Sequence, residues 1–420
     1  MEQILDADIA VVGAGAAGLM TAIWAARASQ GKKYRILLFD TRKKIGAKIL
    51  ISGGTRCNVT HVRVSASDYH GGSRHFIQHV FEAFTPAETI RFFEEIGVKL
   101  VLEETGKYFP VTHSGKTVLD ALLKETGRLG IGLETGVRIS EIKKVGDVFE
   151  CSGDPAGRHY GTRRVILTTG GLSYPETGSD GTGFKIAKDF GHTIVETAPA
   201  LTPLLTDDPD WPSLSGVSLE AQLSFFLGGR KRGEVTGAFL FTHFGFSGPA
   251  ALDVSRYFSR AKFKENPFIE AKFLLDCTEE HLKEICVAAR KNHPRKLLIN
   301  YLNEKFILPE RFWGVCFKKI NLDENTVLRH LSGAAIKNLA GFLLHYRLPV
   351  TGVVGYKKAE VTSGGVDLAE VRVSTMESRR VPGLYFAGEI LDADGRIGGF
   401  NFQWAWSTGA LAGKSAVKSL

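Results

Sequence analysis

The chain has 420 residues, of which 44% are hydrophobic and 23% are charged. This composition is typical of a soluble globular protein and excludes a disordered or fibrous chain. Because ordinary domains hold about 100–200 residues, we expect two or three domains. Lys and Arg outnumber Asp and Glu by 53 to 45, a diffuse basic excess that favours polyanionic partners but serves equally well as a solubility charge.

The cysteines and the longest apolar stretch indicate where in the cell the protein is found. Five cysteines are scattered without a CxxC pair or a Cys/His ligand spacing, so we expect no disulfide framework, no metal site and a reducing, cytoplasmic location. The apolar stretch Ile9–Ala26 is preceded by Asp6 and Asp8, interrupted by glycines and followed by Arg27. We therefore interpret it as neither a signal peptide nor a membrane span.

The first segment predicts a strand, a tight turn, a helix and a second strand. Ile9–Val12 is short and apolar, Gly13–Gly18 is the turn, Leu19–Ala28 has helical composition, and the buried stretch Ile36–Phe39 ends at Asp40. This alternation indicates a parallel sheet with a right-handed crossover. Helices are expected next at Pro86–Ile96 and Thr117–Leu129, and strands at Val137–Ile142 and Val165–Thr168.

The pattern changes near Val195. Prolines cluster there, and the alternating segments Leu219–Leu227 and Gly237–Phe241 predict an antiparallel β module. Helical patterns then follow at Glu279–Arg290, Arg295–Phe306, Thr326–His330 and Ala334–His345. Near Pro349 strands and glycines return. We therefore expect a discontinuous α/β domain (1–194 and 350–420), an inserted β module (195–275, with a return near 345–355) and a helical module (276–345).

The turn after the first strand carries a glycine motif. Gly13, Ala14, Gly15, Ala16, Ala17 and Gly18 match G-x-G-x-x-G between a predicted strand and a predicted helix, and Asp40 closes the second strand. This is the context of a dinucleotide fingerprint, in which Gly13 permits the turn, Gly15 admits the pyrophosphate and Gly18 lets helix and strand pack closely. The helix N-terminus holds the phosphates, and Asp40 accepts from ribose hydroxyls.

The far end of the chain favours FAD over NAD. A strand-like stretch ends at Gly388 and Glu389, Asp392 follows, and a glycine loop with Gly398 and Gly399 leads through Phe400 and Asn401 into a helix. A helix N-terminus of this kind stabilises the negative charge of a reduced flavin.

These residues carry a resemblance to a known family. The Ala-Gly-Glu end with Gly-Gly-Phe-Asn, and the long string from Gly46 to Thr60, resemble bacterial flavoproteins known as NAD(P)/FAD-dependent oxidoreductases. Members include bile-acid dehydro-reductases, an aminoacetone oxidase and a dihydrouridine synthase acting on 23S ribosomal RNA. The resemblance implies an α/β fold: a glutathione-reductase-like FAD-binding Rossmann domain interrupted by an inserted β-barrel-like module and a helical module.

The resemblance also implies roles for individual residues. It places the 13–18 turn on the pyrophosphate, Asp40 on the adenosine ribose, and the Val137 backbone on adenine. Glu389 and Asp392 face the ribityl and phosphate region. The remaining cofactor-binding residues line the flavin, pass beneath the cofactor or meet the pyrimidine edge: Lys48, Ser52, Gly53, Gly54, Arg56, Cys57, Asn58, Thr169, Gly170, Gly171, Gly399, Phe400 and Asn401. Two positions depart from the family pattern, Thr55 in place of Gly and His61 in place of Asn, and the first leaves the local backbone in question.

A second nucleotide-binding domain is not expected. The later glycines between Gly178 and Gly183 do not match G-x-G-x-x-G and follow no suitable strand. If NAD(P)H is the reductant, we expect it to visit the flavin transiently, in alternation with the substrate.

Flavin carries hydride, and the protein must position the substrate and supply protons. The candidate proton donors are Cys57, whose thiol beside Arg56 could have a lowered pKa, together with His243 and Tyr108. Each has a plain alternative: a buried packing cysteine, a hydrogen-bonded loop histidine and an aromatic core residue.

The inserted region combines many basic residues with aromatic ones, which suits RNA but also describes ordinary solvated helix faces. Three functions follow. The first is an FAD reductase that saturates an activated C=C bond, with uridine in 23S ribosomal RNA as the leading substrate. The second is an FAD reductase or oxidase for a small enone or amine. The third is a non-enzymatic RNA-binding protein that contains flavin.

Overall fold

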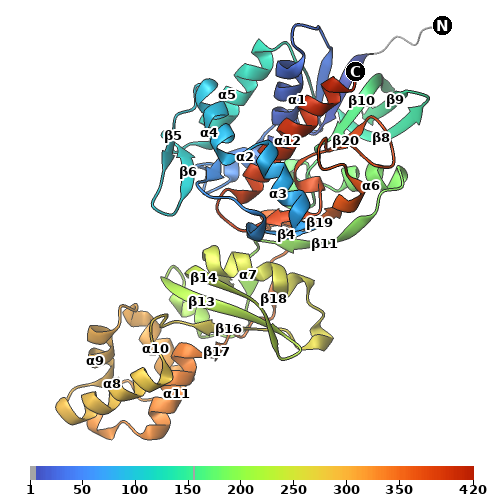
Figure 1. The fold of residues 1–420 in the computed structure, drawn as a ribbon. Coiled ribbons are helices and arrows are strands. Elements are labelled where there is room, and N and C mark those ends of the chain that lie inside the picture. Colours follow the sequence, from blue (N-terminus) through green and yellow to red (C-terminus); the bar gives the residue numbers. More distant parts are fainter. Residues whose placement is uncertain (1–5, 155–156) are drawn as a thin grey trace. The chain divides into compact units, whose positions relative to one another are not determined.

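The computed structural model describes residues 6–154 and 157–420. The chain divides into two compact units, the first running to Pro199 and resuming at Ala359, and the second spanning Ala200–Lys358 (Figure 1). Within the described ranges, no helix is long and apolar enough to cross a membrane. The expected boundary near residue 275 between a β module and a helical module stays a prediction.

A seven-stranded sheet organises the first unit, in the order β7-β2-β1-β10-β9-β8 with β20 paired to β10. β1 lies parallel to both β2 and β10, as the predicted crossover requires, whereas β9 and β8 form an antiparallel extension. Its strands are β1 (Ala7–Val12), β2 (Ile36–Asp40), β7 (Gly132–Thr135), β8 (Arg138–Val145), β9 (Val148–Asp154), β10 (Arg158–Leu167) and β20 (Leu384–Phe386).

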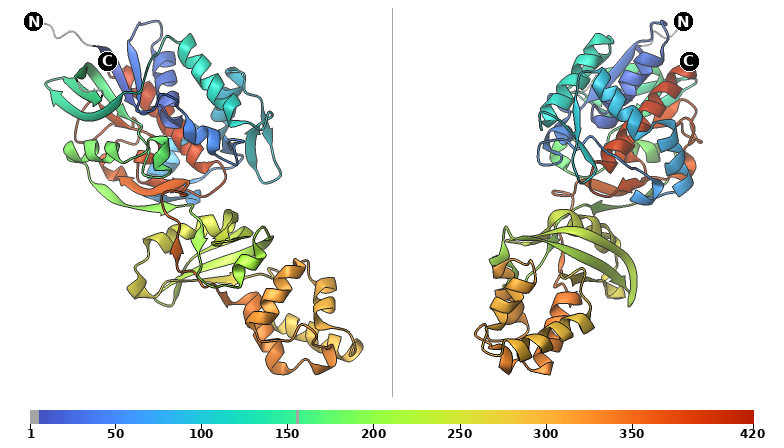
Figure 2. Two further views of the ribbon diagram at one scale, coloured as in Figure 1. Left: turned by 180° about the vertical axis from the view of Figure 1, so that it is seen from behind. Right: turned by 60° about the vertical axis from the view of Figure 1, so that its left-hand side comes forward.

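The two ends of the chain meet in helices α1 (Ala16–Ala28) and α12 (Phe400–Lys418), which lie side by side (Figure 2). A Cβ at Gly409 would lie 2.7 Å from the Ala17 carbonyl oxygen, and one at Gly413 would lie 2.3 Å from the Thr21 carbonyl oxygen. These glycines therefore let the two backbones approach to a distance that no larger residue allows. The contact holds the last helix against the helix that follows the turn Gly13–Gly18.

The two amphipathic helices predicted from the sequence form as α4 (Pro86–Glu95) and α5 (Gly115–Arg128). Thr85 and Glu88 begin α4 with a reciprocal capping box, which explains its clear start. Three further helices of this unit were not predicted from the sequence, namely α2 (Ala47–Ile51), α3 (Arg74–Ala83) and α6 (Thr182–Asp189).

Three small sheets complete the first unit. They comprise β3 (Thr60–His61), β5 (Leu100–Leu102) and β6 (Lys107–Pro110); β4 (Tyr69–Gly71) and β21 (Ala393–Gly395); and β11 (Ile194–Ala200) with β19 (Val361–Val366). The last pair joins the two segments of chain that lead to and from the second unit.

The second unit contains a seven-stranded sheet in the order β17-β16-β13-β14-β15-β12-β18. This order leaves β17 and β18 as edges, so the expected barrel-like module is not confirmed and the sheet is open. Its edge strands are only two residues long, so they have few backbone groups with which to hydrogen-bond to each other and close a barrel. Its strands are β12 (Leu204–Leu205), β13 (Ser218–Leu227), β14 (Arg230–Thr242), β15 (Gly245–Ser247), β16 (Phe268–Lys272), β17 (Tyr346–Arg347) and β18 (Gly352–Val353), and α7 (Gly248–Arg260) packs on them.

Four further helices follow, namely α8 (Glu279–Asn292), α9 (Leu298–Lys305), α10 (Glu310–Lys319) and α11 (Gly333–Leu344). Three match predicted helices, α10 was not predicted, and the expected helix at Thr326–His330 forms only a 3₁₀ turn at Leu328–His330. Sheet and helices share one core, in which Trp211 stacks on Phe241 at 5.4 Å and Phe241 contacts Phe312 at 6.1 Å.

Candidate functional site

The turn between β1 and α1 has the geometry of a phosphate-binding loop. Gly13 has φ +106°, and a Cβ there would lie 2.6 Å from the Thr168 carbonyl oxygen. A Cβ at Gly18 would lie 1.8 Å from the Gly13 carbonyl oxygen, so both positions require glycine. At Gly15, by contrast, a Cβ would meet no atom within 4 Å apart from those of its neighbours in the chain. The space before the α1 N-terminus is therefore open, which suits a phosphate.

Asp40 secures this turn from the end of β2. Its carboxylate accepts hydrogen bonds from the Ala14 N–H at 2.9 Å and the Arg42 N–H at 2.8 Å. Burial raises the pKa of Asp40, and the two backbone donors oppose that shift. The carboxylate is half-buried, with acceptor sites left for ribose hydroxyls. Val137, predicted to meet adenine, is buried, and its N–H donates to the Asp40 carbonyl oxygen at 2.9 Å.

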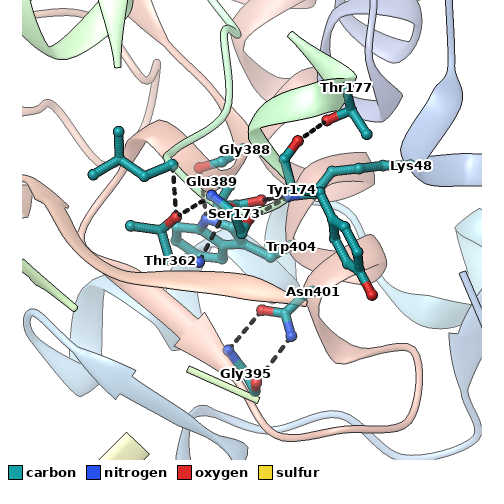
Figure 3. Close-up of polar contacts among 11 residues, drawn as sticks. Lys48, Ser173, Tyr174, Thr177, Thr362, Gly388, Glu389, Gly395, Asn401 and Trp404 are labelled. Carbon is teal, nitrogen blue, oxygen red and sulfur yellow. Dashed lines mark hydrogen bonds and ion pairs between the residues drawn. The ribbon is translucent and has the colours of Figure 1, made fainter. Parts of the chain in front are cut away.

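Glu389 is the centre of a polar network in the first unit (Figure 3). One carboxylate oxygen accepts from the Ser173 hydroxyl at 2.5 Å and the Thr362 N–H at 2.9 Å, and the other pairs with the Lys48 ammonium at 2.5 Å. Lys48 also donates to Ser173 at 2.6 Å. A carboxylate has about four acceptor sites, so one remains for a ligand hydroxyl.

Thr362 and Ser173 were absent from the predicted site. The Thr362 hydroxyl accepts from the N–H groups of Leu172 at 2.7 Å and Ser173 at 3.1 Å, which fixes the loop after β10. Thr362 lies in the stretch Val361–Val366, which also resembles the sequences of that flavoprotein family, and this resemblance was the signal available for it. No pattern in the sequence links Ser173 to Glu389, which lies 216 positions further along.

Thr169, Gly170 and Gly171 lie in the same loop. A Cβ at Gly171 would lie 2.3 Å from the Thr362 hydroxyl oxygen, and Gly170 has φ +73°. The Thr169 hydroxyl is buried without a hydrogen-bond partner in the described residues. Gly388, with φ +80°, would place a Cβ 2.6 Å from the Ala17 Cβ, so this residue also lies against α1.

The glycine loop before α12 is held by one side chain. Asn401 donates to the Gly395 carbonyl oxygen at 2.9 Å and accepts from the Gly395 N–H at 2.8 Å (Figure 3). Gly398 and Gly399 have φ +123° and +92°. Phe400 begins the helix and is fully buried, and Asp392, just upstream, is buried as well.

Asn58 approaches this loop from the other side. A Cβ at Gly399 would lie 2.8 Å from the Asn58 side-chain oxygen, and one at Gly53 would lie 3.2 Å from the Asn58 N–H nitrogen. The Asn58 Oδ1 atom is buried, and none of the described residues donates to it. A buried polar atom without a partner costs about 1–3 kcal/mol, so Asn58 is suited to a ligand donor.

The segment from Ser52 to Asn58 corrects one prediction. Burial raises the pKa of the Cys57 thiol to about 12, which contradicts the lowered pKa of a catalytic thiol and agrees with the alternative of a buried packing cysteine. Arg56 does not activate it, because its guanidinium pairs with Glu103 at 2.7 Å and lies over the Phe109 ring at 4.0 Å. Gly53, Gly54 and Thr55 all have positive φ, and Ser52 donates to the Ile49 carbonyl oxygen at 3.0 Å.

The other two predicted proton donors lie in different units. Tyr108 is half-buried on β6, where its strand pairs with Thr60 and its carbonyl oxygen accepts from the Val59 N–H at 2.9 Å. It therefore belongs to the same unit as Asn58. His243 is exposed in the turn between β14 and β15 of the second unit.

These features fit FAD. The open space before Gly15, the acceptor at Asp40, the remaining site on Glu389 and the unpartnered oxygens of Asn58 and Thr169 all lie in the first unit. The residues that would hold FAD therefore come from the beginning, the middle and the end of the chain.

Comparison with known proteins agrees with this geometry. A family model described as the HI0933-like protein Rossmann domain matches residues 7–415. A 3-dehydro-bile acid delta(4,6)-reductase of Clostridium scindens is 31% identical over 98% of this chain and 99% of its own. A ribosomal RNA dihydrouridine synthase of Escherichia coli is 33% identical, with 96% of each chain covered.

Among solved structures, an E. coli quinol fumarate reductase shares the fold, with TM-score 0.50 and 15% identity over 98% of this chain and 70% of its own. The match over nearly the whole length, with relatives at 31% and 33% identity, shows that this chain belongs to the HI0933-like family of FAD-dependent oxidoreductases.

Proposed function

We propose that this enzyme reduces an activated C=C bond and that its substrate is uridine in 23S ribosomal RNA. The observation that carries the proposal is the 33% identity with a ribosomal RNA dihydrouridine synthase over 96% of both chains. When bound, FAD supplies a hydride from its reduced ring. The substrate then needs one proton to complete the saturated C–C bond.

The chain's own residues support this chemistry by holding the cofactor and positioning the substrate. The 13–18 turn would present N–H groups to the phosphates, and Asp40 would accept from the adenosine ribose. Glu389 would use its remaining acceptor site on the ribityl chain, and Asn58 would meet the flavin edge with its unpartnered oxygen. NAD(P)H serves as a transient reductant in this proposal, because the sequence contains one complete dinucleotide fingerprint.

The proton comes from a group other than Cys57. A thiol with a pKa near 12 is a weak acid at neutral pH and is enclosed by protein. Tyr108 and His243 stay the candidate donors. Tyr108→Phe and His243→Gln variants test them. The variant that still binds flavin but no longer reduces the substrate identifies the proton donor.

A small-molecule enone is the second candidate substrate. It is favoured by the 31% identity with a bile-acid delta(4,6)-reductase over 98% of the chain. The two candidates differ in what accepts hydride, so a single experiment separates them.

The experiment starts with anaerobic reduction of the FAD-loaded enzyme by NADH or NADPH. The reduced enzyme is then mixed with 23S ribosomal RNA from a deletion strain, which lacks the gene for this enzyme. The same RNA from the wild-type strain is the matched control. We expect rapid flavin reoxidation with the first RNA only, together with a mass increase of two hydrogens on one uridine. Reoxidation by a steroid enone but by neither RNA would contradict the ribosomal substrate.

A further inference from the structure

Six basic side chains from two separate segments gather in the second unit. This basic patch consists of Lys291, His293, Arg295, Lys296, Arg329 and His330. The segments are joined by backbone hydrogen bonds from Leu328 to Lys296 at 2.9 Å and from Arg329 to Pro294 at 3.0 Å. All six side chains are exposed except that of Lys296, which is half-buried.

The first segment of the patch has little acidic compensation, whereas Asp323 and Glu324 precede the second segment. From Ile285 to Asn303 the sequence contains no Asp or Glu, and Lys296 forms an ion pair with Glu304, the residue that follows this stretch. The acidic residues of α8 lie in its first half. Cations at a helix C-terminus stabilise the helix dipole, which accounts for Lys291. That explanation does not extend to Arg295 and Arg329, which lie outside α8.

An aromatic ring accompanies the cations. The His293 and Tyr301 rings are 5.9 Å apart, and Tyr301 is half-buried. Phosphate groups pair with exposed Lys and Arg, while unstacked bases stack on aromatic rings. A patch that combines the two is suited to RNA.

A lipid surface is less well matched. An interfacial helix must present its apolar face to the membrane. In α8 that face, which includes Leu282, Ile285 and Cys286, is buried in the core of the second unit.

We propose that the basic patch binds the phosphate backbone of the RNA substrate. This inference rests on the proposed function, since it assigns the surface that holds the ribosomal RNA. The patch gives affinity and orientation, and base recognition belongs to other residues.

The test compares two triple variants of the FAD-loaded enzyme. The patch variant carries Lys291→Gln, Arg295→Gln and Arg329→Gln. The control variant carries Lys283→Gln, Lys305→Gln and Lys337→Gln, which removes the same charge from exposed positions on α8, α9 and α11 of the same unit. Arg290 is left unchanged because it donates to the Leu331 carbonyl oxygen and supports the fold.

Binding of 23S ribosomal RNA from the deletion strain is measured by fluorescence anisotropy across a salt series. We expect the patch variant to bind about tenfold more weakly at 0.15 M salt, with the slope of log K against log salt reduced by about 3, while the control variant keeps the wild-type slope. Equal losses in both variants, or none in either, would overturn the inference.

Two further measurements separate this inference from the proposed function. If the wild-type enzyme reduces a steroid enone but neither binds nor modifies RNA, the RNA substrate and the patch assignment both fail. If the RNA is modified and the patch variant binds it as the wild type does, the patch assignment alone fails. Loss of binding to phosphatidylglycerol vesicles in the patch variant, with RNA binding intact, would also overturn it.

Discussion

The carboxylate of Glu389 lies 2.5 Å from the ammonium of Lys48, although 341 positions separate the two residues in the chain. The pair joins α2, near the beginning of the sequence, to the turn after β20, near its end. Because Ser173 and the Thr362 N–H bind the same carboxylate, the Glu389 side chain connects four segments that lie far apart in the sequence.

A double-mutant cycle on Lys48→Met and Glu389→Gln tests this pair. Both side chains are mostly buried, so we expect a coupling free energy of about 1 kcal/mol in urea unfolding of the apoprotein. The exposed pair Lys185 and Asp189 provides the control and should couple less. A coupling no larger than that of the control would show that the network does not stabilise the unit.

Asp40→Asn tests the adenosine end of the site. The amide retains one acceptor in place of two carboxylate oxygens, so the ribose and the turn compete for it. We expect the affinity for FAD to fall about tenfold, which corresponds to one hydrogen bond to a charged group. FMN lacks the adenosine, so the affinity of the variant for FMN should fall less. Equal losses for FAD and FMN, measured by flavin fluorescence quenching, would place Asp40 away from the ribose.

Thr55→Gly should stabilise the protein. Thr55 is exposed and has φ +72°, a conformation that costs a β-branched residue about 1–2 kcal/mol. Glycine removes that strain but adds chain entropy, so we expect a net gain of about 0.5–1 kcal/mol in the free energy of unfolding. Thr105→Gly, at an exposed position without positive φ, should instead lose stability. A loss at both positions would contradict strain at Thr55.

His192 makes stability depend on pH. Its buried ring bonds Glu370 at 3.0 Å and Ser378 at 2.8 Å, and burial lowers its pKa. As pH falls through the ordinary histidine value of about 6.5, the unfolded chain therefore binds a proton that the folded chain does not, and stability is lost. Glu370, whose pKa is lowered to about 2 chiefly by its hydrogen bond with Arg380, adds a loss in the same direction below about pH 4.5.

His192→Gln removes the histidine contribution. We expect the decline in unfolding free energy between pH 7 and pH 5.5 to become shallower, by at most about 1.4 kcal/mol per pH unit. His75→Gln, an exposed histidine of the same unit, should leave the decline unchanged. If both variants retain the wild-type profile, another group controls the acid response.

The thiols of the native protein should be unreactive. All five cysteines are free and buried, and burial raises the pKa of Cys57 and Cys151 to about 12. At pH 8 we expect slow labelling by a thiol reagent in the native state and five equivalents of rapid labelling in urea. Cys57→Ser should keep the pH profile of hydride transfer. Rapid native labelling with loss of activity would restore Cys57 as a candidate proton donor.

Local patterns determined much of the nucleotide-binding architecture. The strand, the glycine turn, helix α1 and the acidic end of β2 are contiguous in sequence, so their spacing alone predicted Gly13, Gly15, Gly18 and Asp40 as a group. In the second unit, β13, the end of β14 and helices α8, α9 and α11 were visible as well, because period-two and helical patterns are local.

Tertiary structure decided the rest, because it depends on groups that meet only after folding. Glu389 contacts Lys48 and Ser173, which lie hundreds of positions away in the chain, and no local sequence pattern predicts such contacts. The sequence placed a thiol beside an arginine and suggested a reactive Cys57, whereas packing buried the thiol and turned Arg56 towards Glu103. Likewise, strands were predictable but barrel closure was not, since closure depends on how the two edge strands of the sheet pair in three dimensions.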